Sequence, residues 1–273
     1  MFFADYHSHT QFSNDSRTNM RELAQCAYEN GISELCFTDH MDDCCVNDGE
    51  PKIRGSVATW DEEYNEFLAV KREMEGKIEL RLGMELSGYN HMPDLALKIA
   101  KETKGLDFVL ASLHNTRSTL DFFYYKFRDL AECQQIAEEY MKENLEIARL
   151  GGFDCMAHIG YFNKCTARMG FVVRLMDYRD YLEEIFRTLI DKGLGIEINT
   201  SGIMNPMGEP IPNLDALKLY KSLGGEVITV GSDSHGTRFY PGGVKEGYEI
   251  LKAAGFKYVT TFRERKPEFI KVD

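Results

Sequence analysis

Short apolar segments typical of β-strands alternate with amphipathic segments typical of α-helices along the whole sequence. The predicted strands end near residues 6, 38, 84, 112, 157, 199 and 231. Seven strand-then-helix repeats predict a parallel sheet, because each helix returns the chain to the edge where the strands begin. Residues 258–261 could add an eighth strand. The fold is therefore either an open doubly wound sheet or a closed barrel.

Helical patterns fill the intervals between these strands. Asn19 with Glu22, and Thr59 with Glu62, have the spacing of a capping box, which predicts that helices begin there. Later helices are expected over residues 95–103, 130–150, 179–192, 214–223 and before residue 255. Their apolar stripes are typical of packing against a sheet.

The size and composition favour one barrel domain over residues 1–273. A (β/α) barrel commonly needs about 250 residues. The chain has 43% apolar and 28% charged residues, which is a soluble globular balance, and no linker or repeated block divides it.

The charge balance excludes some partners. With a formal net charge of −12 and no run of lysine or arginine, the chain has no basic surface for nucleic acid. The acidic surplus would repel a phosphorylated substrate unless bound divalent cations reversed the local charge.

The seven cysteines form no CxxC pair, which indicates reduced thiols and a cytosolic protein. The N-terminal apolar run is too short for a signal peptide, and no segment approaches the length of a membrane span. We therefore expect a cytoplasmic location and no membrane contact. The sequence does not indicate the oligomeric state.

Six of the seven histidines directly follow predicted strands. The strand-end residues with metal-binding side chains are His7, His9, His40, Glu85, His114, His158, Asp233 and His235. In a barrel all C-terminal strand ends open onto one face, whereas an open sheet has its site only where strand order reverses. One histidine at a strand end is common without a metal, but the joint pattern predicts a closed barrel with a polynuclear metal site. Imidazoles and carboxylates without thiols suit zinc, manganese or iron.

Two irregular segments, Met41–Ser56 and Phe162–Asp177, are expected to overhang the barrel mouth as loops. The first contains acidic side chains, namely Asp42, Asp43, Asp48 and Glu50. The second contains Lys164, Arg168 and Arg174.

Cationic side chains near the mouth are candidates for binding phosphate oxygens, because a guanidinium or ammonium group donates charge-assisted hydrogen bonds. Lys164 and Arg168 in the second loop, with Ser201 after a strand, are the preferred candidates. Arg17, Arg117 and Arg238 also follow strands that carry metal-binding residues, and they are alternatives.

The combination of motifs resembles the polymerase and histidinol phosphatase (PHP) superfamily of metal-dependent phosphoesterases. The matching segments are DYHSHTQFSND, FTDH, GMELSGY, SLH, CMAHIGY and VGSDSH. Within the superfamily the chain is most similar to stand-alone histidinol-phosphate phosphatases, through EINTSG and PNLDALKLYKSLGGEVITVGSDSH. The resemblance covers almost the full length.

The resemblance implies a distorted (β/α)₇ TIM-like barrel that holds three divalent ions. It assigns the first ion to His7, His9, Glu85 and Asp233, the second to Asp15, His40 and His235, and the third to Glu85, His114 and His158. Glu85 would then bridge two ions. Many members have histidine where this chain has Asp15. Asp39, beside His40, is expected to support the site rather than to bind metal.

The resemblance also implies a phosphoric monoester hydrolase that converts L-histidinol phosphate to L-histidinol and phosphate in histidine biosynthesis. A metal-activated hydroxide would attack phosphorus. Asp233, His235 or a metal-bound water would stabilise the leaving alkoxide. The ammonium and imidazole groups of such a substrate could be held by the acidic segment Met41–Ser56.

Three alternatives stay open. The chain could hydrolyse another small phosphate ester. An amidohydrolase also begins with HxH, but it needs lysine, histidine and aspartate where this chain has His114, Asn199 and Thr260 or Thr261. The third alternative is a catalytically silent metal-binding module, which the complete set of metal-binding residues disfavours.

Overall fold

Eight parallel strand segments form the centre of the computed structural model, which describes residues 1–46, 55–238 and 240–272. They are β1 (Ala4–Asp5), β2 (Glu34–Phe37), β3 (His40–Met41), β4 (Glu79–Ser87), β5 (Phe108–Ser112), β6 (Cys155–Met156), β7 (Gly195–Asn199) and β8 (Ile228–Gly231). The sheet order is β1-β2-β4-β5-β6-β7-β8, and the short β3 pairs with the far half of β4.

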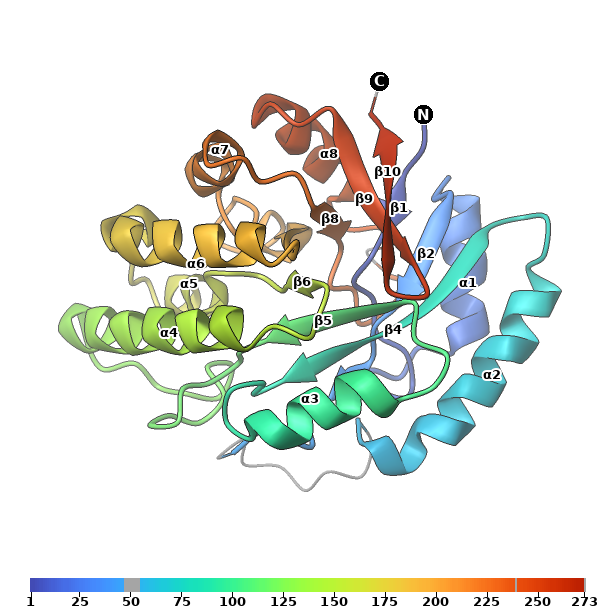
Figure 1. The fold of residues 1–273 in the computed structure, drawn as a ribbon, viewed down its shortest axis with the longest axis horizontal. Helices are drawn as coiled ribbons and strands as arrows, with labels where there is room; N and C mark the ends of the chain where they lie inside the picture. Colours follow the sequence, from blue (N-terminus) through green and yellow to red (C-terminus); the bar gives the residue numbers. More distant parts are fainter. Residues whose placement is uncertain (47–54, 239, 273) are drawn as a thin grey trace.

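Helices surround the strands on the outside (Figure 1). The α-helices are α1 (Met20–Glu29), α2 (Trp60–Glu73), α3 (Pro93–Glu102), α4 (Leu130–Leu150), α5 (Tyr161–Arg168), α6 (Arg179–Asp191), α7 (Leu214–Ser222) and α8 (Val244–Ala253). Short 3₁₀ helices cover Val57–Thr59, Leu175–Tyr178 and Thr200–Gly202. Among the described residues, no helix combines the length and the hydrophobicity needed to cross a membrane.

The sheet closes on itself between β8 and β1. The amide of Tyr6 donates a 2.8 Å hydrogen bond to the carbonyl of Val230, and a parallel bridge pairs Ser8 with Ser234. Closure makes one barrel of seven parallel strands and confirms the prediction of a barrel over an open sheet. It also places the segment after β1 beside the segment after β8.

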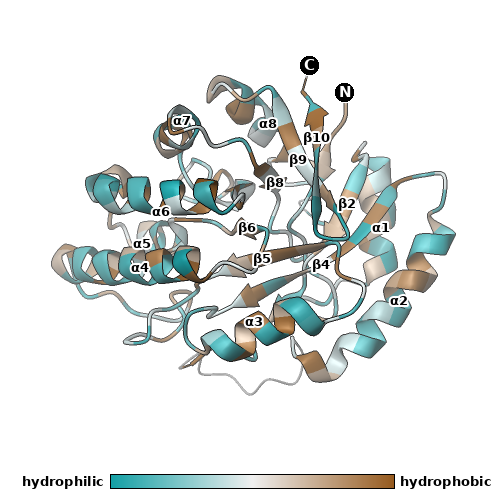
Figure 2. Cartoon of the chain, viewed as in Figure 1, coloured by the Kyte–Doolittle hydropathy of each residue, from teal (hydrophilic) through white to brown (hydrophobic). Residues whose placement is uncertain are grey.

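The helices pack one apolar face against the barrel. Helix α4 buries Ile136, Ala137 and Tyr140 on one side, and hydrophobic and hydrophilic residues alternate along it and along α2 (Figure 2). A smaller apolar cluster, which includes Tyr6 and Phe108, fills the barrel interior near the N-terminal ends of the strands. The core therefore leaves the opposite end of the barrel, where the strands finish, to polar side chains.

The possible eighth strand is not part of the barrel. Strand β9 (Tyr258–Arg263) pairs antiparallel with β10 (Lys266–Lys271) in a separate two-stranded sheet. Glu264 and Arg265, with φ of 50° and 64°, form the tight turn that reverses the chain. Phe262 packs 4.9 Å from Phe108, the first residue of β5, so the hairpin covers the N-terminal end of the barrel.

Arg265 is one of the residues that attach the hairpin to the barrel, and loss of its guanidinium should lower stability. The guanidinium contacts the buried Asp154 carboxylate and donates to Ala100 O at 2.9 Å. We expect Arg265→Gln to lower the free energy of unfolding by about 2 kcal/mol, because a buried carboxylate loses its charged donor. Arg263→Gln is the control. Its exposed pair with Glu268 should be worth less than about 0.5 kcal/mol. Urea unfolding measures both, and equal losses would contradict this role.

Two helix predictions need correction. Residues 162–177 are not simply a loop, because α5 begins at Tyr161 and buries Phe162 and Cys165. Thr59 makes no side-chain capping bond to α2. The capping side chain in this region is Ser56, which accepts from the amide of Ala58 and caps the preceding 3₁₀ helix Val57–Thr59. The predicted cap at Asn19 is confirmed by its bond to the amide of Arg21.

The strand predicted to end at Met84 continues to Ser87, because β4 pairs with β3 on one side and with β5 on the other. Glu85 therefore lies within a strand. Of the predicted acidic segment, Asp48 and Glu50 lie outside the described residues.

Candidate metal centre

Glu85 lies at the centre of the converging strand ends and is fully buried. Its carboxylate is approached by five imidazole nitrogens from different strand ends. His40 Nδ1, His7 Nε2 and His9 Nε2 lie 2.8, 3.3 and 3.6 Å from Oε2, and His158 Nε2 and His114 Nε2 lie 2.8 and 3.0 Å from Oε1.

The barrel register produces this convergence. His40 pairs directly with Glu85 across β3 and β4. His7 and His9 are two residues apart after β1, and both rings point inward. His158 and Asp233 have φ of 24° and 54°, a backbone region that L-residues rarely adopt. Such strain clusters at functional sites, where the surrounding structure holds it.

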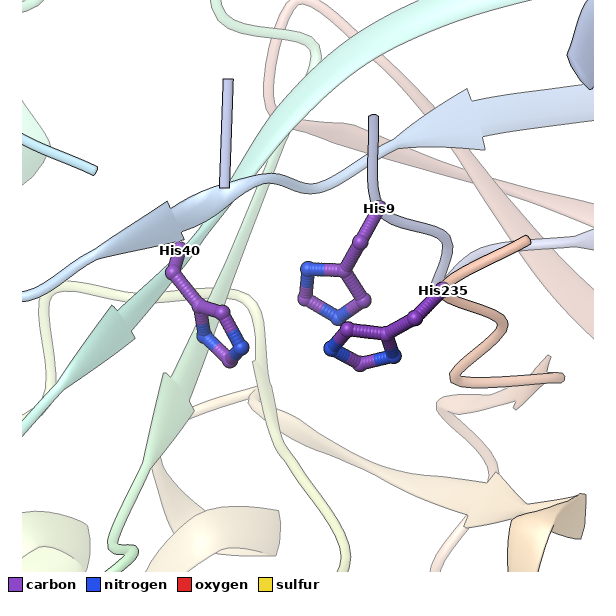
Figure 3. A group of neighbouring side chains, drawn as sticks. All are labelled: His9, His40 and His235. Carbon is purple, nitrogen blue, oxygen red and sulfur yellow. The ribbon is translucent and has the colours of Figure 1, made fainter. Parts of the chain in front are cut away.

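Asp233, His235 and Asp15 form the outer part of the cluster. Asp233 Oδ1 lies 3.4 Å from His9 Nε2, and Asp15 Oδ2 lies 3.0 Å from His235 Nε2. Figure 3 shows His9, His40 and His235 gathered from three separate segments, and the rings of His9 and His235 stack at 4.0 Å. The Asp15 side chain is 52% exposed, so it meets the cluster from the solvent side.

The nitrogen and oxygen atoms of the cluster form overlapping groups of three, and within each group all atoms lie within 4.8 Å of one another, close enough to share a metal ion. The groups are His7 with His9 and Glu85, Glu85 with His114 and His158, His9 with His40 and His235, and His40 with Asp42 and His114. The first two correspond to residues predicted to share an ion. The third group contains His40 and His235, which are predicted to share the second ion. It is completed by His9 and not by the predicted Asp15, which lies nearer the surface. Asp42 was not among the predicted ligands.

Several donor atoms of the cluster fit a role in metal binding. His7 Nε2, His9 Nε2, His40 Nδ1 and Glu85 Oε2 are buried and make no hydrogen bond within the described structure. Buried polar atoms are almost always satisfied, and unpaired ones have a large desolvation cost. Cations held between these atoms would satisfy them, so the side chains fit divalent metal ions.

The charges of the carboxylates and histidines in the cluster are coupled. Burial lowers the pKa of His7, His40 and His114, but Glu85 and neighbouring carboxylates outweigh burial and raise it above the usual value. Burial raises the pKa of the Glu85 carboxyl, but positive charge on His114, His7 and His40 outweighs burial and holds this pKa well below its usual value. Burial together with His235 and His40 holds the pKa of His9 well below its usual value. Glu85 is therefore an anion and His9 a neutral imidazole, the states in which both bind metals.

Glu197, in the middle of β7, orients two of the histidines. Its Oε1 lies 2.6 Å from His7 Nδ1, and its Oε2 accepts from the amide of His158 at 2.9 Å. This contact leaves Nε2 of His7 directed at Glu85. The sequence-based prediction missed Glu197 as a site residue, although its place two residues before Asn199 on one strand was a signal that it points inward.

Asp39 supports His9 in a similar way, as expected from the sequence. Its Oδ1 accepts from the amide of Thr10 and from Ser13 Oγ, both at 2.6 Å. Ser13 Oγ in turn lies 3.0 Å from His9 Nδ1. Asp39 is therefore occupied by hydrogen bonds that fix the loop after β1.

Gly231 allows β8 to pass close to Glu197 and His7, and a side chain at position 231 should displace these two residues. A Cβ at Gly231 would overlap Glu197 Oε1 and the Cβ of His7. We expect Gly231→Ala to lower stability by about 2 kcal/mol and zinc affinity roughly tenfold. Gly236→Ala is the control, because its Cβ would lie 3.5 Å from the nearest atom, Thr18 Oγ1. Thermal unfolding and zinc titration test this. Wild-type stability and zinc affinity in Gly231→Ala would show that Glu197 and His7 can move without harm to the site.

A cavity of about 300 Å³ opens beside the cluster. Its wall includes Asp15, His40, His114, Asp233, His235, Lys164 and Arg168. Lys164 and Arg168 come from α5, the helix that replaces the predicted loop. Both side chains line the cavity, and their role in binding a substrate stays a prediction.

Ser201 is held beside Lys164. Lys164 Nζ lies 2.7 Å from Ser201 Oγ and 3.4 Å from Asp233 Oδ2. Ser201 is not part of the cavity wall, but it links Lys164 to Asp233 through its own 3.1 Å bond. Of the alternative cations, Arg117 is paired with Glu146 at 2.8 Å.

Comparison with known proteins agrees with this geometry. The PHP domain family matches residues 5–201. A histidinol-phosphatase of Lactococcus lactis subsp. lactis is 27% identical over 96% of this chain and 95% of its own length.

Solved structures extend the comparison to the fold. A crystal structure of histidinol phosphate phosphatase from Lactococcus lactis, complexed with zinc, L-histidinol and phosphate, has a TM-score of 0.76 at 25% identity. The match covers 97% of this chain and 98% of that one. A second structure, from Listeria monocytogenes, has a TM-score of 0.74 at 18% identity over 89% and 99% of the two chains, which supports the fold alone. With the family match spanning most of the sequence, this chain belongs to the PHP domain family.

Proposed function

We propose that the chain is a metal-dependent phosphomonoesterase that hydrolyses L-histidinol phosphate to L-histidinol and phosphate. The observation that supports it most is the buried Glu85 carboxylate surrounded by histidines from separate strand ends, beside a cavity with basic side chains. The relative with zinc, L-histidinol and phosphate bound supports the same substrate. We treat residues 1–273 as one phosphoesterase domain.

We assign three divalent ions, of zinc, manganese or iron, to the cluster. One would be held by His7, His9, Glu85 and Asp233, one by Asp15, His40 and His235, and one by Glu85, His114 and His158. When bound, divalent cations supply charge neutralisation at the phosphate and a nucleophilic water at neutral pH. Glu85 would hold two of them, because its two oxygens face different sets of histidines.

The remaining side chains of the cavity bind and position the ester. Lys164 and Arg168 donate to phosphate oxygens, and Ser201 fixes the ammonium group of Lys164. Asp233 and His235 lie at the cavity wall, where either can handle the proton that the leaving alkoxide requires. Burial raises the pKa of the Asp233 carboxyl, but Lys164 and His7 outweigh burial and hold it well below its usual value.

Activity assays test the proposal directly. The purified protein, loaded with zinc or manganese, should hydrolyse L-histidinol phosphate faster than other phosphomonoesters, phosphodiesters and amides. Preference for a different phosphomonoester would keep the chemistry and change the substrate. Hydrolysis of amides alone would indicate an amidohydrolase, and no turnover after metal loading would indicate a silent module. The free cysteines are consistent with the cytoplasm, where we place the reaction.

A further inference from the structure

The wall of the cavity at the barrel mouth carries both basic and acidic side chains. Lys164 and Arg168 come from α5, and Lys164 lies near Asp233. Asp121, Phe123 and Tyr124 belong to the segment between β5 and α4, and the Phe123 ring lies against Arg168. A bound phosphate gains from the basic side chains, but it gains nothing from the Asp121 carboxylate.

Asp121 is partly buried, and one hydrogen bond to its carboxylate is described. Its Oδ1 accepts from the amide of Phe123 at 2.8 Å. Within the described part of the chain, no lysine or arginine nitrogen lies within 4.0 Å of it. Burial raises the pKa of Asp121, and the nearby Asp42 raises it further, while His114 and His40 oppose this. The ammonium group of a ligand would supply the cationic partner that this carboxylate lacks among the described residues.

The aromatic neighbours of Asp121 also suit a cationic group. Phe123 and Tyr124 are 53% and 50% exposed, so a ligand in the cavity can reach their rings. The Phe123 ring already receives a cation, because the Arg168 guanidinium carbon lies 4.7 Å from its centroid. Aromatic faces attract lysine, arginine and ligand cations in this way.

We propose that Asp121 is a specificity-determining residue that binds the ammonium group of a cationic phosphomonoester. The ester then lies with its phosphate toward Lys164 and the metal ions and with its ammonium group toward Asp121. A cavity of about 300 Å³ is large enough for one small ester of this kind. The proposal rests on the proposed function, and it assigns the cationic group to Asp121 rather than to the segment 41–56.

A matched pair of substrates tests the assignment. L-histidinol phosphate carries the ammonium group, and 3-(imidazol-4-yl)propyl phosphate is the same ester without it. The metal-loaded wild-type protein should have a kcat/KM about 30-fold higher for the first, since a hydrogen bond to a charged group contributes that much. Asp121→Asn should lose about 30-fold on L-histidinol phosphate, mainly through KM, and less than about threefold on the analogue.

A control variant separates a local effect from a change of net charge. Asp191→Asn removes one negative charge at the exposed end of α6, and both substrates should keep their wild-type kcat/KM. Metal content and the thermal midpoint of Asp121→Asn should match the wild type, because Asp121 is assigned to no ion.

The outcomes distinguish the two proposals. If the wild-type protein hydrolyses neither ester, the proposed function fails. If it hydrolyses both equally well, or if Asp121→Asn loses the same factor on both, the esterase stands and the role of Asp121 is overturned. Equal kcat/KM of the wild-type protein for the two esters overturns the role of Asp121 even if the variant does not fold.

Discussion

Replacing Glu85 by alanine is expected to remove more than one metal ion from each chain and to lower kcat by about 10⁴-fold. The Glu85 carboxylate lies within 3.6 Å of five histidines. Three are at one oxygen and two at the other, namely His7, His9, His40, His114 and His158. Its loss leaves those imidazoles without a shared anion. Cations supply several kcal/mol of charge stabilisation to phosphoryl transfer, and about 5 kcal/mol corresponds to this change in rate.

Metal analysis and steady-state kinetics on the same preparations measure the effect. Glu79→Ala is the control, because Glu79 lies at the opposite end of β4, and its side chain is 46% exposed. It should keep the wild-type metal content. Loss of a single ion from Glu85→Ala, with the others bound as before, would show that Glu85 does not bridge.

Changing Glu197 to glutamine should weaken zinc binding and kcat/KM by about 10- to 100-fold, although Glu197 is assigned to no ion. Its carboxylate accepts from His7 Nδ1 at 2.6 Å and fixes the ring, so that Nε2 is the free ligand atom. Carboxylates that orient metal-binding histidines commonly have effects of this size. Glutamine keeps the volume but offers a neutral amide, which can also donate to Nδ1 and favour the wrong tautomer.

Zinc affinity, measured by competition with a chelator, is the decisive quantity for Glu197→Gln. Glu226→Gln makes the same chemical change at an exposed pair with Lys221, and it should leave zinc affinity unchanged. Wild-type affinity and wild-type kcat/KM in Glu197→Gln would mean that Glu197 is a packing residue without influence on His7.

The barrel and the convergence of histidines followed from sequence because both depend on repeated local patterns. A strand followed by a helix specifies parallel pairing, and His7, His40 or His158 at a strand end inherits its position from that pairing. The final hairpin was not predicted, because β9 looks like another barrel strand locally. The tight turn at Glu264 and Arg265 reverses the chain, so that β9 pairs with β10 in place of the barrel strands.

The supporting residues of the site were harder to predict for a different reason. Glu197 and Asp121 acquire their roles from contacts with residues far away in sequence, and a lone acidic residue carries no signal of such contacts. Helix α5 is difficult to predict because it is eight residues long and begins after Gly160 with no capping side chain. Phe162 and Cys165 become buried only when the helix lies over the barrel mouth.

The most direct test of the metal centre is a crystal structure of the purified protein with anomalous diffraction measured at the edges of zinc, manganese and iron. We predict three anomalous peaks at the C-terminal end of the barrel, two of them in contact with the Glu85 carboxylate. An active protein whose anomalous peaks lay elsewhere, or which hydrolysed L-histidinol phosphate with no metal near Glu85, would contradict this account.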